Sequence, residues 1–229
     1  MSVALFDLDN TLLGGDSDYL WGRFLVNRGV VNGEEYERRN QEFYEHYHDG
    51  TLDIYEFARF AYRPLADNPL DELKMLRVEY VREHIRPIVL PAAVELLEKH
   101  RKRGDRLVII TATNRFVTRP IADELGVGDL IATEPEFREG AYTGELAGIP
   151  CFREGKVERL RQWLDEHGEN LEDSWFYSDS HNDIPLLEQV TRAIAVNPDD
   201  TLRRVASEKG WPIISLREPE ADTQTGSAG

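Results

Sequence analysis

Near the start of the sequence lies the stretch Val3-Ala4-Leu5-Phe6-Asp7-Leu8-Asp9-Asn10-Thr11. Its unbroken apolar beginning is typical of a strand that is buried on both faces of a parallel sheet. In α/β sheets the carboxyl end of such a strand opens into the crevice where ligands bind. Asp7 and Asp9 are one residue apart and lean to the same side if the backbone stays extended. The stretch therefore predicts an α/β fold with two carboxylates at its ligand crevice.

Two carboxylates held side by side need something that relieves their repulsion. Like charges about 4 Å apart repel by roughly 4 kcal/mol at an effective dielectric constant of about 20. A cation or a shared proton relieves this repulsion, so Asp7 and Asp9 indicate a divalent metal site in which one carboxylate is free to react. The alternative is a strand end followed by an ordinary turn, because Asp-Asn-Thr is favourable turn chemistry.

The size and charge of the chain limit its class and its partners. It has 229 residues, 41% hydrophobic and 31% charged, which fits one globular domain or a core with an inserted subdomain. A formal net charge of −16 argues against a nucleic-acid groove and against adhesion to an anionic membrane. A small phosphorylated metabolite remains a suitable partner, because a metal ion and a few cationic groups dominate the field inside a cleft. The sequence leaves the oligomeric state open.

Cysteine content and targeting signals indicate the compartment. Cys151 is the single cysteine, so no intrachain disulfide can form, which fits a reducing compartment. Because no nucleophile motif surrounds it, we expect Cys151 to be a half-buried bystander. The N-terminus lacks the basic segment and cleavage site of a signal peptide, and no stretch approaches the roughly 18 apolar residues of a membrane span. We therefore expect a cytoplasmic protein.

Apolar runs typical of buried strands alternate with helical patterns along the chain. The expected helices are Pro91–Arg103, before Gly104, and Lys156–His167, before Gly168. Strands that alternate with helices indicate βαβ units, so we predict a three-layer, Rossmann-like α/β core with a parallel sheet. Residues 136–147 alternate around a Glu-Gly turn and predict a small β-hairpin. The expected strands are residues 3–7, 106–111, 130–133, 174–178, 193–196 and 213–214.

The segment from residue 14 to residue 87 interrupts this alternation. It shows helical patterns only, and a connection of about 70 residues is far longer than the usual loop. We therefore predict a helical cap at 14–87, inserted into a core formed by 1–13 and 88–217 and lying over the crevice. We expect its many aromatic residues to form the cap's own small core rather than a ligand cage. The polar segment 218–229 is expected to be a disordered tail.

Four polar segments end predicted strands or begin predicted helices, and together they match the needs of phosphoryl transfer. Such a reaction depends on positioning and on neutralising the charge of the phosphate. Oxygen ligands suit Mg²⁺, which keeps several of its waters in near-octahedral geometry, and carboxylates are known phosphoryl acceptors. The four segments are Asp7 to Thr11, Val108 to Asn114, Lys156, and Trp175 to Asp183.

Each residue type has a possible role in this chemistry. Asp7 is the candidate nucleophile, and Asp9 can protonate the leaving alkoxide and then deprotonate the attacking water. Thr111 and nearby backbone N–H groups, including that of Ala112, can donate to the phosphate, which Lys156 can also bind. The candidate metal site consists of Asp7, Asp179 and a carbonyl at or near Asp9, and its surroundings include Asn182 and Asp183.

Each segment taken alone also has an ordinary structural explanation. A lysine at a helix start is usually solvated, and a threonine at a strand end usually caps a helix. Asp179 with Asp183 fits an ordinary acidic loop. Asp16 and Asp18 are N-cap candidates, and His181 fits a loop residue or a substrate contact.

In this order the segments resemble the four motifs of the haloacid dehalogenase superfamily of aspartate-nucleophile phosphatases. Asp7 to Thr11 matches the first motif, Thr111 the second, Lys156 the third, and Asp179 to Asp183 the fourth. The predicted insertion looks like that superfamily's C1 cap. Thr143-Gly144-Glu145 resembles the phosphoserine-phosphatase branch, subfamily IB. Gly14 to Trp21 resembles a bacterial subgroup that includes histidinol-phosphate phosphatases.

The sequence also departs from the phosphoserine enzymes. They carry a glutamate that reads the substrate amine, where this chain has Asp16. Their serine and glycines after the second core strand are replaced here by residues 111–114. Their glycine before the aspartate of the fourth motif is replaced by Ser178. A shorter acid and a bulkier loop argue against phosphoserine itself. An acid in the cap still suits an amine-bearing alcohol, with Asp16 and Asn114 as its candidate readers.

The resemblance implies a Mg²⁺-dependent phosphomonoesterase of small amino-alcohol monophosphates that forms an aspartyl phosphate. Histidinol phosphate is the first candidate substrate and L-phosphoserine the second, which implies a role in amino-acid biosynthesis. A phosphomutase, or a phosphatase of another small metabolite, would use the same residues. A receiver-like signalling module, a non-catalytic phosphate-binding protein and a dehalogenase fit the sequence less well. A receiver has no cap and has adjacent rather than alternating acids, and a dehalogenase has no role for Asp9.

Overall fold

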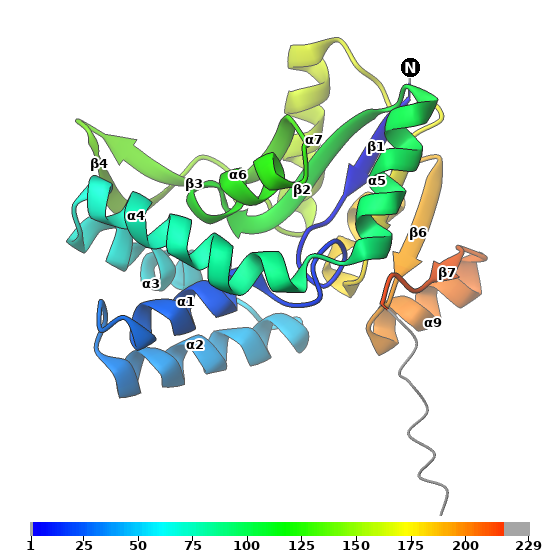
Figure 1. Cartoon of the computed structure of the whole chain (residues 1–229). Coiled ribbons are helices and arrows are strands. Elements are labelled where there is room, and N and C mark those ends of the chain that lie inside the picture. Colours follow the sequence, from blue (N-terminus) through cyan, green and yellow to red (C-terminus); the bar gives the residue numbers. More distant parts are fainter. Residues whose placement is uncertain (1, 218–229) are drawn as a thin grey trace, which may run out of the picture.

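The computed structural model describes residues 2–217. The segment 218–229, expected to be a disordered tail, lies outside the described residues. The centre of the molecule is a seven-stranded sheet with the strand order β4-β3-β2-β1-β5-β6-β7, parallel except for β4 (Figure 1). Its strands are β1 (Val3–Phe6), β2 (Arg106–Asn114), β3 (Asp129–Arg138), β4 (Ala141–Ala147), β5 (Trp175–Ser178), β6 (Arg192–Val196) and β7 (Ile213–Ile214).

Helices cover both faces of this sheet. The longer core helices are α5 (Pro91–Arg103), α6 (Arg115–Glu124), α7 (Glu154–His167) and α9 (Asp200–Lys209). A short 3₁₀ turn, η3 (His181–Asp183), leads into the single-turn helix α8 (Ile184–Leu187). The expected helix at 91–103 is confirmed to the residue, and the one expected at 156–167 begins two residues earlier.

Alternating side chains of β1 divide the core into two layers. Ala4 and Phe6 pack with the cluster that contains residues of α5 and α6, whereas Val3 and Leu5 pack with the cluster formed by α7, α8 and α9. All four side chains are fully buried, as expected for a central parallel strand. The prediction of a three-layer α/β core with a parallel sheet is therefore confirmed.

The hairpin is present, but its first strand does not start where expected. The strand predicted at 130–133 and the first half of the hairpin form one continuous strand, β3, which pairs with β2 at its start and with β4 at its end. Pro135 lies at the crossover, where the β3–β4 register shifts. Glu139 and Gly140 have positive φ values of 49° and 88° and form the tight turn.

Strand β2 also extends further than expected. It was predicted to end at Thr111, but it continues to Asn114 through a register shift after Ile110. Such an irregularity redirects side chains at a strand end. Residues 111–114 therefore belong to the end of a strand, and the bulkier loop expected there is absent from the described part of the chain.

Between β1 and α5 the chain forms a helical insertion, as expected. Its helices are α1 (Ser17–Asn27), α2 (Gly33–His48), α3 (Ile54–Asp67) and α4 (Leu70–Tyr80), followed by a π-helical turn, η1 (Val81–Ile85), and a 3₁₀ turn, η2 (Arg86–Ile88). The two ends meet at a bridge between Leu13 and Val89. Division of the chain into a core of 1–13 and 88–217 and a cap of 14–87 stays a prediction.

The aromatic residues of the insertion form a small core of their own only in part, where Phe43 packs with Phe57 and Phe60. Trp21 and Phe24 join the same cluster as α5 and α6, and the Trp21 ring lies 6.0 Å from that of Phe116 on α6. Phe43 packs in a smaller cluster with Leu52 and with Phe152 from the core. These contacts attach the insertion to the sheet domain.

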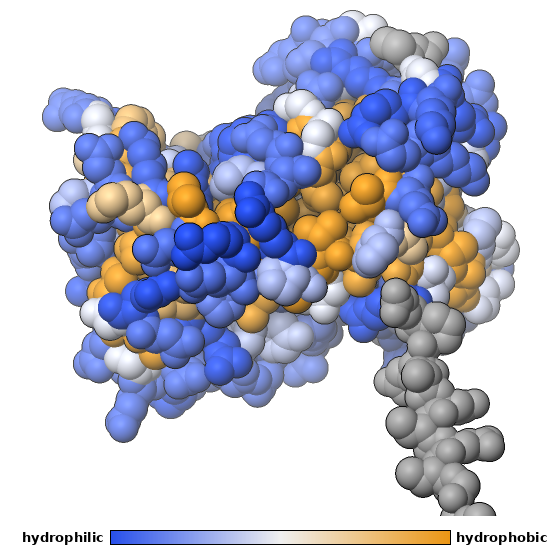
Figure 2. Space-filling view, viewed as in Figure 1, coloured by the Kyte–Doolittle hydropathy of each residue, from blue (hydrophilic) through white to orange (hydrophobic). Residues whose placement is uncertain are grey.

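The surface of the insertion is mostly hydrophilic on the face shown in Figure 2, where apolar residues gather beside helix α5. None of the helices within residues 2–217 is long and apolar enough to cross a bilayer.

Candidate active site

A cleft lies where the carboxyl ends of β1, β2 and β5 meet the insertion. It encloses about 50 Å³, far below the roughly 300–1,000 Å³ of pockets that take small-molecule ligands. The insertion therefore lies close over the sheet. The core side of the cleft is formed by Asp7, Asp9, Asn10, Thr111, Ala112, Thr113 and Asp179, and the insertion side by Asp16, Asp18, Tyr19, Asn40, Phe43, Tyr44, Tyr47, Leu52, Ile54 and Phe57.

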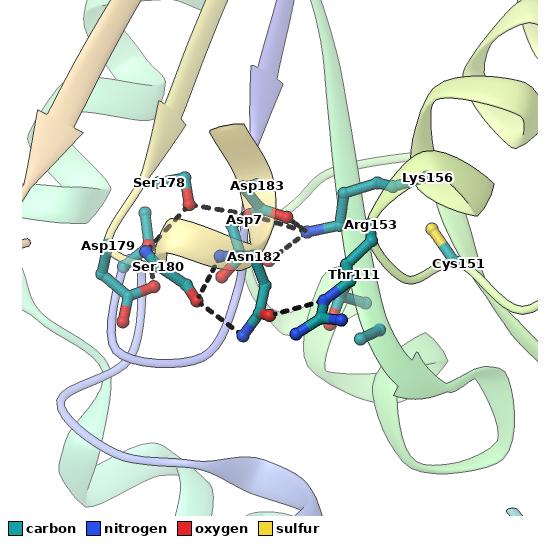
Figure 3. A network of polar contacts seen from close by, with 12 residues as sticks. Asp7, Thr111, Cys151, Arg153, Lys156, Ser178, Asp179, Ser180, Asn182 and Asp183 are labelled. Atoms are coloured by element: carbon teal, nitrogen blue, oxygen red, sulfur yellow. Dashed lines mark hydrogen bonds and ion pairs between the residues drawn. The ribbon is translucent and has the colours of Figure 1, made fainter. Parts of the chain in front are cut away.

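Lys156 connects the first and fourth predicted segments. It lies in the first turn of α7, and its side chain is 2% exposed. Its Nζ donates to Asp7 Oδ1 at 2.9 Å and lies within 2.8 Å of both carboxylate oxygens of Asp183 (Figure 3). Burial opposes the charge of Lys156, but Asp183 and Asp7 outweigh it and raise the pKa of the ammonium above its usual value. A lysine at a helix start is thus a buried cation between two acids, not a solvated side chain.

The Asp7 carboxylate is also held in a strongly perturbed environment. Burial raises its pKa to about 7, against the nearby positive charge of Lys156, while Asp183 and Asp9 raise the pKa further. The main chain of Asp7 is fixed by its N–H group, which donates to the Tyr177 carbonyl at 2.9 Å. A fixed, buried carboxylate beside a lysine has the position required of a nucleophile.

Asp9 is oriented by two donors that the sequence did not reveal. The Ser17 N–H group donates to Asp9 Oδ1 at 2.6 Å, and the Thr113 hydroxyl donates to Oδ2 at 2.8 Å. Burial raises the pKa of Asp9 to about 7, and the nearby Asp16 adds to this shift. A carboxyl group that titrates near neutral pH suits alternate donation and removal of a proton.

Asp179 completes the acidic edge of the cleft. Its Oδ1 accepts a 3.1 Å hydrogen bond from the Thr11 hydroxyl. Burial, followed by the charges of Asp7 and Asp183, raises its pKa well above the usual value. Mutual repulsion of this kind is relieved by a bound cation.

The donors fit a hard divalent cation. Within residues 2–217, no three His, Cys, Asp or Glu side chains stand close enough together to hold a metal ion by themselves. Mg²⁺ commonly binds through one or two carboxylates and retains several waters. The predicted set of Asp7, Asp179 and a carbonyl at or near Asp9 needs only two carboxylates, so the chemistry of these donors remains suitable.

Residues behind the acids support them. The Ser178 hydroxyl donates to Asp183 Oδ2 at 2.7 Å (Figure 3). Asn182 is buried and binds Ser180 and the Tyr47 carbonyl. Two of the positions that depart from the phosphoserine enzymes, Thr113 and Ser178, therefore contact acids of the site. The sequence differences from the phosphoserine enzymes pointed to Thr113 and Ser178. The acids that these two residues contact are seen only in the folded structure.

The second predicted segment lies on the opposite side of the cleft. Thr111 is buried, and its hydroxyl accepts from the Thr113 N–H group at 3.2 Å. Ala112 is half-buried and lines the cleft. Asn114 is buried outside the cleft lining, where it caps α6 through Val117 and approaches Asp18 at 3.4 Å.

Asp16 is both a helix cap and a lining residue of the cleft, and its reading of a substrate stays a prediction. Its Oδ1 accepts from the N–H groups of Asp18 and Tyr19, which makes it the N-cap of α1, and it also lines the cleft. Asp18, expected only as a cap candidate, lines the cleft too. Burial raises the pKa of both carboxyls, and Asp16 raises that of Asp18 further.

These motifs occur in known proteins. The family model of the haloacid dehalogenase-like hydrolases matches residues 4–188. The chain belongs to this family. A histidinol-phosphatase from Neisseria meningitidis serogroup C is 41% identical over 220 residues, which cover 94% of this chain and 99% of that protein. The family membership and this relative establish the chain as a phosphatase.

Solved structures agree with the fold of this haloacid dehalogenase-like hydrolase. A protein of unknown function from Bordetella pertussis Tohama I is 47% identical, with a TM-score of 0.90 over 94% of this chain and 99% of that one. A substrate-bound phosphoserine phosphatase superposes with a TM-score of 0.69 at 19% identity, over 94% of this chain and 93% of its own. The second likeness shows a shared fold.

Two further candidates lie outside the cleft lining of this hydrolase. Cys151 is fully buried rather than half-buried, and burial raises the pKa of its thiol to about 12, so it remains an unreactive bystander. His181 binds Asp199, with its Nδ1 at 2.8 Å and its backbone N–H group at 2.7 Å from Oδ2. The substrate contact considered for His181 is not supported by this placement.

Proposed function

We propose that this hydrolase is a Mg²⁺-dependent phosphomonoesterase that acts on small amino-alcohol monophosphates through an aspartyl-phosphate intermediate. Histidinol phosphate is the first candidate substrate and L-phosphoserine the second. The observation that carries the proposal is the arrangement of Asp7, held by Lys156, beside a separately oriented Asp9.

The two acids divide the reaction between them. An Asp7 carboxylate oxygen attacks phosphorus, and the bond from phosphorus to the ester oxygen breaks. The Asp9 carboxyl gives its proton to the leaving alkoxide, which departs as the alcohol. Asp9, now a carboxylate, takes a proton from a water molecule, whose oxygen attacks phosphorus. The bond to Asp7 then breaks, and inorganic phosphate leaves.

The other residues bind and orient the phosphate. Lys156 offsets negative charge on Asp7 and on the phosphate, while the Thr111 hydroxyl and the Ala112 N–H group donate to its oxygens. Mg²⁺ would be held by Asp7, Asp179 and a carbonyl at or near Asp9, and when bound it would offset the charge that develops on the phosphoryl group. Asn182 and Asp183 order the loop that carries Asp179.

The insertion side of the cleft fits the alcohol portion of such a substrate. It combines two carboxylates, Asp16 and Asp18, with the aromatic side chains of Phe43, Tyr44 and Phe57. Buried acids favour a cation, and aromatic rings favour a cation or a flat apolar group. An imidazole-bearing amino alcohol offers both features, and the 41% identical relative is named a histidinol-phosphatase.

A panel of phosphate monoesters tests the proposal. Release of inorganic phosphate should be fastest from L-histidinol phosphate and should require Mg²⁺. Transfer of phosphate within the substrate, without its release, would instead identify a phosphomutase. Absence of turnover on every amine-bearing ester, with turnover of other esters, would overturn the proposed substrate class but not the phosphatase.

A further inference from the structure

The insertion contacts the core at a second place, beside the catalytic cleft. The Arg153 guanidinium donates through Nη2 to the Gly50 carbonyl in the α2–α3 connection. Figure 3 shows its second contact, in which Nε donates to Asn182 Oδ1 at 3.0 Å. Asn182 in turn donates through Nδ2 to the Tyr47 carbonyl at 3.2 Å. One guanidinium and one amide therefore bind two carbonyls of the insertion to the loop that carries Asp179 and Asp183.

The backbone of Arg153 is strained. Its φ of 51° and ψ of −123° lie in a region that suits glycine and disfavours a residue with a Cβ atom. Such a conformation persists only where the surroundings hold it, and these outliers gather at sites that need a fixed geometry. The contacts of the Arg153 side chain are therefore candidates for what holds this backbone conformation.

The opposite side of this contact is equally constrained. Gly50 has a φ of 68°, and a Cβ added to it would lie 2.8 Å from His181 Nε2 and 3.1 Å from Arg153 Nη2. The His181 ring is fixed by its bond to Asp199. The connection between α2 and α3 thus approaches the core so closely that a residue larger than glycine does not fit.

This contact connects the insertion to Lys156, a candidate phosphate-binding residue, and to the loop that carries Asp179 and Asp183. The Arg153 carbonyl accepts from the Lys156 N–H group at 3.0 Å, so Arg153 also begins the helical turn that carries the buried lysine. Tyr47, whose carbonyl accepts from Asn182, and Leu52, two residues after Gly50, line the cleft. The cleft encloses only about 50 Å³, which fits a closed position of the insertion.

We propose that Arg153 is a positioning residue that holds the insertion closed over the cleft and fixes Asn182 in the closed state. Its contact with the Gly50 carbonyl forms when the insertion is closed and breaks when the insertion opens. The proposal rests on the phosphatase activity of the chain and not on the identity of the alcohol. Loss of Arg153 should therefore weaken catalysis by favouring the open state.

Arg153→Gly separates this role from a structural one. Glycine adopts the observed backbone angles without strain, so the melting temperature should stay the same or rise. Arg86→Ala is the matched control, because Arg86 also joins the insertion to the core, through Glu124 on α6, but is not among the residues that line the cleft. Hydrogen exchange of the amides of residues 47–52 reports closure without any substrate.

The expected result for Arg153→Gly is a roughly tenfold or greater loss of kcat/KM and faster exchange at residues 47–52. Millimolar guanidinium ion should restore part of the activity of Arg153→Gly. It should leave the activity of Arg86→Ala unchanged. Arg153→Lys should resemble Arg153→Gly, because an ammonium does not reproduce the two-pronged contact. All assays use the ester that the wild type hydrolyses fastest, so failure of histidinol phosphate as substrate leaves this test intact.

Two outcomes would overturn the proposal. One is kcat/KM of Arg153→Gly within about twofold of the wild type. The other is unchanged exchange at residues 47–52 despite a loss of activity, which would place the effect at Lys156 or elsewhere rather than in closure.

Discussion

Lys156 Nζ lies 2.9 Å from Asp7 Oδ1, and both side chains are buried at the carboxyl end of the sheet. The pair joins residues 149 positions apart in the chain. Lys156 also binds Asp183. Its positive charge therefore offsets the negative charge of both carboxylates when no ligand is bound.

Asp7→Asn should abolish turnover, because an amide does not form the acyl phosphate. Removal of a nucleophile is expected to lower kcat by several orders of magnitude. Steady-state phosphate release measures the effect, and a melting curve serves as the folding control. Activity within about tenfold of the wild type would refute the assignment of Asp7.

Metal removal should stop the reaction. The carboxylates of Asp7, Asp179 and Asp183 repel one another, and a bound cation relieves this repulsion. We therefore expect no turnover in EDTA and full recovery with Mg²⁺. Ca²⁺ should inhibit, because its larger and looser coordination shell misplaces the carboxylate and the phosphate. Full activity after exhaustive chelation would contradict the metal role.

Most of the fold could be predicted because its signals are local. The apolar run of β1 and the Gly104 and Gly168 helix ends are each read from a few neighbouring residues. The junction of β3 with the hairpin was missed, because pairing with β2 and with β4 decides where one strand stops and the other begins. Whether the aromatic residues of the insertion face its own interior or the sheet domain likewise depends on packing between distant segments.

The site divides in the same way. The acids and Lys156 were found because their residue types and order fit a known chemistry. Thr113 and Ser178 stood out only as departures, and the contact of Arg153 with Gly50 left no trace in the sequence. Thr113 and Arg153 contact partners 104 and 103 positions away, and no local pattern specifies a contact of this kind.

His100 should make stability depend on pH. Its ring is 2% exposed and lies between Asp105, 2.7 Å from Nδ1, and the Tyr177 hydroxyl, 2.9 Å from Nε2. Burial lowers its pKa, despite the opposing effect of Asp105. The folded state therefore favours the neutral ring, whereas the unfolded chain takes up a proton near pH 6.5. Stability from this group is complete above that pH and falls as the pH drops through it.

Urea unfolding of the wild type and of His100→Gln at pH values from about 7.5 to 5.5 measures this effect. His100→Gln should be less stable at every pH, by about 1–3 kcal/mol, because Asp105 and Tyr177 lose a buried partner. Its free energy of unfolding should also change less with pH. His48, whose pKa burial also lowers, contributes with the same sign in both proteins. Parallel pH curves for the two proteins would show that His100 does not cause the dependence.

Asp16→Asn should reveal whether the insertion reads a cationic alcohol. Asp16 caps α1 as well as lining the cleft, so Asp16→Ala would remove both functions and cost about 1 kcal/mol of stability. Asparagine caps a helix as well as aspartate does, and it removes only the charge.

We expect kcat/KM for L-histidinol phosphate to fall roughly 30-fold or more, as is typical when a buried charge pair is broken. Glycerol 2-phosphate, which lacks a cation but also releases an alkoxide, controls for indirect effects, because Asp16 also raises the pKa of Asp9 and a change there alters both substrates alike. Asp18→Asn, which leaves the cap intact, tests the neighbouring acid in the same way. Unchanged activity on both substrates, measured at one pH and one Mg²⁺ concentration, would assign Asp16 to the helix cap alone, and equal losses on both would assign its effect to Asp9.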